Sequence, residues 1–394
     1  MYIDYIKMSE SIQYHTVFPS NTLTSYTEFS QVDFLTTFEN RKLELNSLRL
    51  CFDVVVGTGG DELINITSNP DMFYDGAVGF HGVIDSVTTT RDGAVIENIT
   101  DYGRLVAMKT QAQKTRTELA TTQDSIEGKV PLDRMSNRVI RGTASGKFTV
   151  DADPAVANYL SSEVVLPQAA LKLHCCLNNA FSTDGGLPLL SYRKSGAIKV
   201  SLRLARNFGF LYGTDVDGDT VYSLQNLKLT YVSRADDRTD VPVMARSIVN
   251  IKQAIASDAA NISVVVPATA NGVSVSFQPQ IYENTAGRNN TQLWRIPGLT
   301  QVQYLFNNSD EYITFIIKSE QESLERYIGS FGDTGSNTAN LVKLRTNNAY
   351  GLGTGLGRYV DLSRQKFNIQ IQSRISETAQ TWLAYLYFHA LLEL

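Results

Sequence analysis

The stretch Thr381-Trp-Leu-Ala-Tyr-Leu-Tyr-Phe-His-Ala-Leu-Leu-Glu-Leu394 closes the chain and reads as one long apolar strand. Side chains alternate between the two faces of a strand. Both faces are apolar here, with Leu383, Tyr385 and Tyr387 on one and Ala384, Leu386 and Phe388 on the other. Such a strand needs a packing layer on each side. A sandwich core supplies one layer, and an oligomer interface or a second domain supplies the other.

A second long apolar strand, Tyr222–Arg234, lies near the middle of the chain. The same order of parts precedes each strand: short strands, one capped short helix, then strands again. Asp153-Pro154 predicts the start of one helix, which ends near Tyr159. Ser319-Glu-Gln-Glu322 is a capping box that predicts the other, ending at Gly329. The repetition predicts an all-β fold, with two tandem eight-stranded jelly-roll β-sandwiches, short helices and one inserted amphipathic helix.

A chain of 394 residues is too long for one core and predicts two or three domains. We expect an N-terminal arm at 1–28, a first jelly roll at 29–236 and a second at 237–394. A β-bulge is expected near Asn46-Ser47, where the alternation changes register. The expected strands are 29–38, 43–56, 164–166, 171–177, 197–204, 222–233, 243–251, 262–266, 273–277, 302–306, 312–317, 341–345, 367–372 and 382–392.

The helical insertion at 104–146 interrupts this pattern, after an irregular segment at 61–103. Apolar residues recur in it every seven positions, at Leu105, Ala112, Leu119 and Ile126, and predict an amphipathic helix that Gly128 closes. The insertion holds eight Lys or Arg residues against four Asp or Glu. We interpret it as a solvated helix lying on the sandwich. The alternative is contact with DNA, anionic lipid or an acidic partner.

The net charge of −5 and the pI of about 5.5 are not those of a strongly basic nucleic-acid-binding protein. Residues 1–40 contain one basic residue, Lys7, against five acidic ones. An arm that neutralises a genome needs many more positive charges. Residues 1–15 instead predict a short amphipathic helix or an arm that contacts a membrane or a neighbouring subunit. We find neither a signal peptide nor an apolar run long enough to cross a membrane.

Two short motifs resemble ligand sites. Gly351-Leu-Gly-Thr-Gly-Leu-Gly357 contains fragments of a dinucleotide-binding pattern, but the residues after it predict a strand rather than the required helix, so we interpret it as a flexible loop. Asp215, Asp217 and Asp219 are candidates for a Ca²⁺ site, but the glycine and glutamate of a calcium-binding loop are absent, which favours a hairpin turn.

The remaining reactive side chains are too few and too dispersed for catalysis. The histidines have no ligand spacing for zinc, and the cysteines are interpreted as small buried residues rather than as disulfide partners. We therefore predict no catalytic, cofactor-binding or metal-binding residue, no cofactor and no enzymatic activity. The residues concerned are His15, His81, His174 and His389, with Cys51, Cys175 and Cys176.

Several segments resemble the double jelly-roll major capsid proteins of the PRD1/adenovirus-type lineage of icosahedral DNA viruses. They are Leu166-Pro167, Leu171–Asn179, Gly186-Leu-Pro-Leu-Leu-Ser-Tyr192 and Ile198–Leu204. In that family a strand leads through a loop to a small-Leu-Pro-Leu turn and then to an alternating strand late in the first jelly roll. The tyrosine-rich last strand is also similar.

The resemblance implies a virion protein that forms homotrimers with a nearly hexagonal outline. These trimers tile an icosahedral shell, commonly over an internal lipid membrane, and the chain length is typical of a small membrane-containing bacteriophage. Implied partners are neighbouring trimers, vertex (penton) and minor capsid proteins and an internal membrane, without sequence-specific nucleic-acid binding. Assembly would take place in the host cell. The alternative is a β-sandwich protein that binds carbohydrate or a receptor, such as a virion spike or a lectin-like module.

Overall fold

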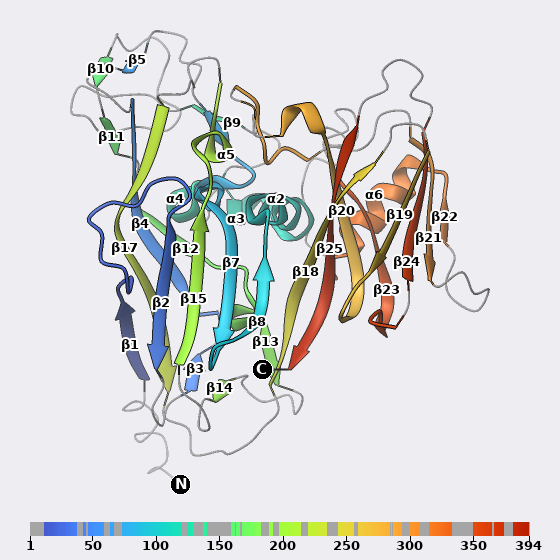
Figure 1. Ribbon diagram of the computed structural model, residues 1–394, viewed down its shortest axis with the longest axis horizontal. Coiled ribbons are helices and arrows are strands. Elements are labelled where there is room, and N and C mark those ends of the chain that lie inside the picture. Colours follow the sequence, from blue (N-terminus) through green and yellow to red (C-terminus); the bar gives the residue numbers. More distant parts are fainter. Residues whose placement is uncertain are drawn as a thin grey trace.

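Two β-sandwiches lie side by side in the computed structural model, with helix α2 (Tyr102–Gln113) between them (Figure 1). The strands of the two sandwiches run in roughly the same direction. The residues that the structure describes are 12–37, 42–44, 46–58, 64–66, 73–119, 124–129, 137–139, 159–161, 163–165, 168–182, 189–191, 197–213, 220–234, 243–255, 259–283, 285, 287–293, 299–306, 315–332, 350–364, 366–373 and 381–393.

The larger sheet of the first sandwich has the order β11-β4-β17-β3-β14, with β1 paired to β17 and β12 paired to β4. The long strand β17 confirms the apolar strand predicted near the middle of the chain. It pairs antiparallel with β4, then with β3. The bounds are β1 (Ile12–Val17), β3 (Lys42–Glu44), β4 (Arg49–Thr58), β11 (Glu163–Val165), β12 (Ala169–Lys172), β14 (Leu189–Ser191) and β17 (Thr220–Arg234).

The facing sheet of the first sandwich has the order β2-β15-β7-β8. Its strands are β2 (Gln31–Thr37), β7 (Ile84–Arg91), β8 (Ala94–Ile99) and β15 (Ala197–Leu204). Two small sheets, β10-β5 and β16-β6-β9, lie at one end. They contain β5 (Ile64–Ile66), β6 (Phe73–Asp75), β9 (Asn137–Val139), β10 (Tyr159–Ser161) and β16 (Leu211–Tyr212).

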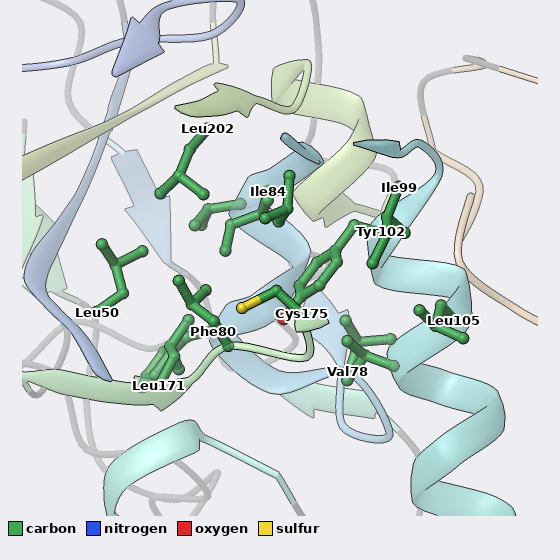
Figure 2. Close-up of a cluster of buried hydrophobic side chains, with 14 of the residues drawn as sticks. Leu50, Val78, Phe80, Ile84, Ile99, Tyr102, Leu105, Leu171, Cys175 and Leu202 are labelled. Carbon is green, nitrogen blue, oxygen red and sulfur yellow. The ribbon is translucent and has the colours of Figure 1, made fainter. Parts of the chain in front are cut away.

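Large apolar side chains from both sheets fill the first sandwich (Figure 2). Leu50 of β4 and Leu202 of β15 come from opposite sheets, and Leu105 of α2 closes the same cluster. All three side chains are buried. Helix α2 is therefore part of this core rather than an addition to its surface.

The second sandwich contains nine described strands, of which eight come from the second half of the chain, four in each sheet. One sheet has the order β13-β18-β25-β20-β23, in which β13 (Ala180–Ser182) comes from the first half of the chain, and the other has the order β19-β24-β21-β22. The bounds are β18 (Val243–Ile255), β19 (Ala259–Val265), β20 (Thr269–Pro279), β21 (Leu299–Phe306), β22 (Phe315–Ile317), β23 (Leu352–Asp361), β24 (Lys366–Ser373) and β25 (Trp382–Glu393).

The closing strand β25 is buried on both faces from Trp382 to Phe388, as its sequence predicts. Trp382, Ala384, Leu386 and Phe388 belong to the core of the second sandwich. Leu383, Tyr385 and Tyr387 belong to the core that contains the first sandwich and α2. The second packing layer therefore comes from the other half of the same chain, which was one of the two alternatives that the sequence left open.

Short helices complete the described structure. They are η2 (Gly79–Val83), α3 (Arg116–Glu118), α4 (Asp124–Glu127), η4 (Cys176–Asn178), α5 (Asn207–Phe210), η5 (Gln280–Tyr282) and α6 (Glu320–Gly329). The predicted capping box begins α6, where the Ser319 side chain accepts a hydrogen bond from the backbone N–H of Glu322. The helix predicted to end at Gly128 ends at Gln113 instead, and Gly128 follows the separate short helix α4 with φ of 68°, a left-handed conformation that favours glycine.

The register change predicted near Asn46-Ser47 is present, but it is a break between two strands, β3 and β4, rather than a bulge within the expected strand 43–56. The pairing with β17 shifts from Leu43 opposite Ser233 to Arg49 opposite Thr230, and Asn46 has φ of 63°. The hydroxyl of Ser47 donates to the carbonyl oxygen of Glu44 and accepts from the backbone N–H of Val232 at 3.1 Å. The side chain thus replaces backbone pairing where the ladder is interrupted.

The prediction of irregular structure over 61–103 was wrong for its second half. Residues 84–99 form the hairpin of β7 and β8, whose turn has Gly93 with φ of 82°. Polar residues obscure the alternation, because Thr89 and Glu97 occupy buried positions beside Val87 and Ile99. The apolar pattern was therefore too weak to indicate two strands.

Residues 352–357 of the flexible loop predicted at 351–357 belong to strand β23, and Gly351 immediately precedes it. Its glycines permit close packing on one side against α6 and on the other against β20. A Cβ atom at Gly351 would lie 2.4 Å from the carbonyl oxygen of Val275, and one at Gly353 would lie 2.9 Å from the hydroxyl of Ser330. Glycine in this strand therefore marks close approach rather than a loop.

Some further predictions were wrong, and others concern residues outside the described part of the chain. Residues 12–15, expected in a helix or free arm, form part of strand β1 paired with β17. The strand expected at 171–177 stops at Lys172 and is followed by the turn η4. Tyr159 begins strand β10, while the rest of the helix expected from Asp153, the strand at 341–345 and the Asp215–Asp219 motif lie outside the described residues.

Candidate assembly surface and the junction between the sandwiches

Helix α2 forms the junction between the sandwiches. Its heptad positions Leu105 and Ala112 are buried, as the spacing predicts, but so are most of its other residues. A helix that is buried around its circumference sits between two packing layers. Our interpretation of a solvated helix was therefore wrong for α2, because most of this helix is covered by the protein itself.

Arg104 fixes this junction from the first turn of α2. Its guanidinium donates to the side-chain oxygen of Gln278 at 2.6 Å and to the carbonyl oxygen of Gln292 at 3.1 Å. It also donates to the carbonyl oxygen of Asn290. The guanidinium carbon lies 4.1 Å from the centre of the Tyr385 ring, and only 4% of the residue is exposed. A planar fork of donors is suited to this task, since each acceptor takes a separate N–H.

Further hydrogen bonds across the junction involve both ends of α2. The hydroxyl of Tyr387 donates to the carbonyl oxygen of Asp101 at 2.9 Å. At the other end, the amide of Gln113 donates to the carbonyl oxygen of Phe331 at 3.1 Å. The two sandwiches are thus bonded through directional contacts as well as apolar packing, which fixes their relative orientation.

A buried ionic cluster lies beneath α2. Glu127 lies 2.9 Å from the ammonium of Lys129 and 3.2 Å from Nε2 of His81, and all three side chains are at most 2% exposed. Burial by itself raises the pKa of Glu127, but His81 and Lys129 lower it well below its usual value. Nδ1 of His81 lies 3.3 Å from the hydroxyl of Tyr102, which is consistent with a neutral imidazole that donates through Nε2.

We expect His81 to make the folded state sensitive to acid. Burial, with Lys129, lowers the pKa of His81 to about 4 from 6.5. Between these values the unfolded chain binds one more proton than the folded chain, so stability falls as the pH falls. The His81→Gln variant should lose up to about 1.4 kcal/mol per pH unit of this dependence.

Denaturant unfolding of the wild type and of His81→Gln, from about pH 6.5 down to pH 4.5, measures this difference. Burial raises the pKa values of Glu97 and Asp75, which act in the opposite direction, but both proteins share these groups. Glu127 contributes only when the pH approaches the ordinary pKa of a glutamate, near pH 4.5 and below. Equal pH dependence in the two proteins would contradict the assignment.

The structure places the other reactive side chains as follows. His81 and His174 are neighbours, with ring centres 5.4 Å apart, although they are far apart in sequence. His15 stacks on Tyr231, and His389 contacts the Ser274 hydroxyl at 2.8 Å. Cys175 and Cys176 are buried, as expected, whereas Cys51 is only half-buried. Within the described part of the chain, no three His, Cys, Asp or Glu side chains form a group suited to a metal ion.

Exposed apolar side chains mark a candidate assembly surface. Every large exposed apolar residue in a described strand lies on an edge strand: Ile12 and Tyr14 on β1, Leu35 on β2, Val95 on β8, Val265 on β19, Ile316 on β22 and Tyr359 on β23. Single exposed apolar residues are common on proteins. An edge strand with exposed apolar side chains can pair or pack with another chain. These strands therefore indicate where a neighbouring subunit would bind.

None of the helices that the structure describes has the length and apolar character needed to cross a membrane.

Comparison with protein-family models gave no match, and no curated protein matched the sequence. Solved structures gave matches along nearly the whole chain. The Faustovirus major capsid protein shares 10% identity, with 98% of this chain and 90% of that chain covered and a TM-score of 0.63. A chain of the PBCV-1 virus capsid shares 10% identity, with 97% and 94% covered and a TM-score of 0.56. The mavirus major capsid protein shares 11% identity, with 97% and 87% covered and a TM-score of 0.51.

These matches show the fold. The chain has the double jelly roll of viral major capsid proteins, which confirms the predicted fold class and the resemblance of the sequence segments. At such low identity the likeness concerns architecture alone. The roles of Arg104 and Glu127 at the junction were not predicted. In a basic segment, the sequence does not distinguish a buried charged residue from a solvated one. The heptad of apolar residues was the available signal that this segment packs against something.

Proposed function

We propose that this chain is a major capsid protein that forms homotrimers and that these trimers tile an icosahedral virion shell. The main support is the double jelly roll along 98% of the chain, shared with the Faustovirus major capsid protein. The proposed division is two building units, one that reaches residue 236 and includes strand β1 from the expected arm, and one at 237–394. The comparisons give no support to the carbohydrate- or receptor-binding alternative.

The placement of the edge strands supports a ring. Figure 1 places β1 at the outer side of the first sandwich and β22 at the outer side of the second. Contact between different surfaces of identical subunits closes into a ring when the rotation permits. Three copies joined in this way carry six sandwiches around one axis, which gives a nearly hexagonal block. Rigid junctions through α2 preserve the angle between the sandwiches of each copy.

The proposed mechanism is assembly without chemistry. Apolar area removed from water contributes about 25 cal/mol per Å² to trimer formation. Lost translational and side-chain freedom opposes it. Contacts between trimers should be weaker and more polar, so that misplaced blocks dissociate. We further propose vertex and minor capsid proteins as partners, a location in the virion, and a shell whose subunits do not read nucleic-acid sequence.

Placing a charge on an edge strand should weaken the trimer without unfolding the subunit. Ile316 on β22 is 51% exposed, and Ile316→Glu puts a carboxylate where the proposal buries an apolar side chain. We expect trimer dissociation at protein concentrations at least about tenfold higher than for the wild type, since burial of an unpaired charge is costly. Sedimentation velocity at several concentrations measures this shift.

The matched control is Gln370→Glu, which adds the same charge to an exposed position of β24, an interior strand of the same sheet. This control should leave the trimer unchanged. Circular dichroism should show the same fold in both variants. An Ile316→Glu variant that associates as tightly as the control would remove β22 from the proposed interface.

A further inference from the structure

A cavity of about 310 Å³ lies at the junction, and both sandwiches contribute to its wall. Lys109 comes from α2 and Lys172 from β12, both in the first half of the chain. Arg246 of β18 and His389 of β25 come from the second half. This volume is near the lower end of the range for small-ligand sites, about 300–1,000 Å³.

The wall of the cavity carries an excess of positive charge. Its basic side chains are Lys109, Lys114, Lys172 and Arg246, against a single carboxylate, Glu127. Glu127 already binds Lys129 and His81, and Lys114 pairs with Glu118 at 3.5 Å. Within the part of the chain that the structure describes, no carboxylate forms an ion pair with Lys109, Lys172 or Arg246.

The basic groups affect one another. The pKa of Lys109 is lowered to about 8, mainly by burial and also by Lys172 and Lys129, while Glu97 acts in the opposite direction. Burial also lowers the pKa of Lys172, as do Lys114 and Arg49. Like charges gathered in a partly enclosed space raise the energy of the unliganded protein, and an anion among them relieves that cost.

We propose that this cavity binds a small phosphate-class oxyanion that carries more than one negative charge. Three basic groups without a paired carboxylate match a multivalent anion better than a single carboxylate. The guanidinium of Arg246, which is the exposed member of the set, offers paired donors to phosphate oxygens. The ligand joins α2 and β12 to β18 and β25, so its binding stabilises the orientation of the two sandwiches.

Calorimetric titration of the full-length protein with inorganic phosphate, pyrophosphate and tripolyphosphate, in a chloride buffer of constant ionic strength, tests the proposal. We expect affinity to increase with the charge of the anion, and the thermal unfolding midpoint to rise with its concentration. Lys109→Met and Lys172→Met should each weaken binding at least about tenfold. Lys366→Met, at an exposed position on β24 away from the cavity, should bind like the wild type.

Two readouts keep the test decisive. Without anion, Lys109→Met should be at least as stable as the wild type, because it removes an unpaired cation. If the Lys109→Met variant does not fold, the Lys172→Met variant carries the binding test, because Lys172 lies at a partly exposed position. A second experiment measures co-sedimentation of the protein with vesicles that contain phosphatidic acid. Co-sedimentation that is lost in Lys109→Met and Lys172→Met would show that the bound phosphate belongs to a lipid headgroup. Binding of the soluble anions without binding to vesicles would show that the ligand is a free phosphate. No binding in either arm, or equal binding by all variants, overturns the proposal.

Discussion

Replacing Arg104 with alanine should lower the free energy of unfolding by roughly 3–5 kcal/mol, because it removes three hydrogen bonds that a buried cation donates to buried or partly buried oxygens. The side-chain oxygen of Gln278 and the carbonyl oxygens of Asn290 and Gln292 all lose their N–H partner. The stacking of the guanidinium on Tyr385 is lost as well. Denaturant unfolding followed by tyrosine fluorescence measures the loss.

Arg364→Ala is the matched control, since this arginine is exposed in the turn after β23. Its effect should be within about 0.5 kcal/mol. The Arg104→Ala variant should also open the junction, so limited proteolysis should release fragments that the wild type does not give. A loss below about 1 kcal/mol, with an unchanged digestion pattern, would show that Arg104 does not hold the sandwiches together.

Glu127→Ala should cost about 3–5 kcal/mol, because it leaves the ammonium of Lys129 buried without its carboxylate. Lys129 is 1% exposed and cannot reach water without rearrangement. The variant also removes the partner of His81 and the acceptor of the backbone N–H of Lys172 at 3.3 Å. Chemical denaturation at neutral pH gives the free energy.

A double variant separates charge burial from lost packing. Glu127→Gln/Lys129→Met removes both charges at similar volume and should recover most of the stability that Glu127→Ala loses. Glu325→Ala, at an exposed site of α6, should change stability by less than about 0.5 kcal/mol. If the double variant is as unstable as Glu127→Ala, the cost does not come from the unpaired lysine.

The sequence was most informative where a side-chain pattern has one physical solution. Strand β25 is apolar on both faces, and only a layer on each side can bury it. The capping box at Ser319 likewise specifies a helix start, and the structure confirms it. The jelly-roll class followed from such elements and from the segments that resemble capsid proteins.

The sequence pattern gave the wrong secondary structure where contacts with distant parts of the chain determine which residue type fits. The glycines at 351 and 353 suggested a loop, but they permit α6 and β20 to approach β23. Thr89 and Glu97 suggested irregular structure, but their polar groups are buried within the hairpin of β7 and β8. Glu97 accepts hydrogen bonds from the Cys176 backbone N–H at 2.7 Å and the Ser247 hydroxyl at 2.6 Å. Partners so distant in sequence leave no local signal.

The candidate assembly surface was also beyond sequence reasoning. An exposed valine or isoleucine has the same appearance in sequence on an edge strand as on an interior strand. Only the strand order shows that Val265 and Ile316 lie at the two edges of one sheet. The charge excess of the cavity was equally hidden, because Lys109, Lys172 and Arg246 come from three separate elements.

The solution mass of the purified protein, by light scattering at several concentrations and salt levels, tests self-assembly most directly. The account predicts a stable trimer near three times 43.6 kDa, or growth from that species into large particles. A protein that stays a monomer of 43.6 kDa at every concentration would contradict it.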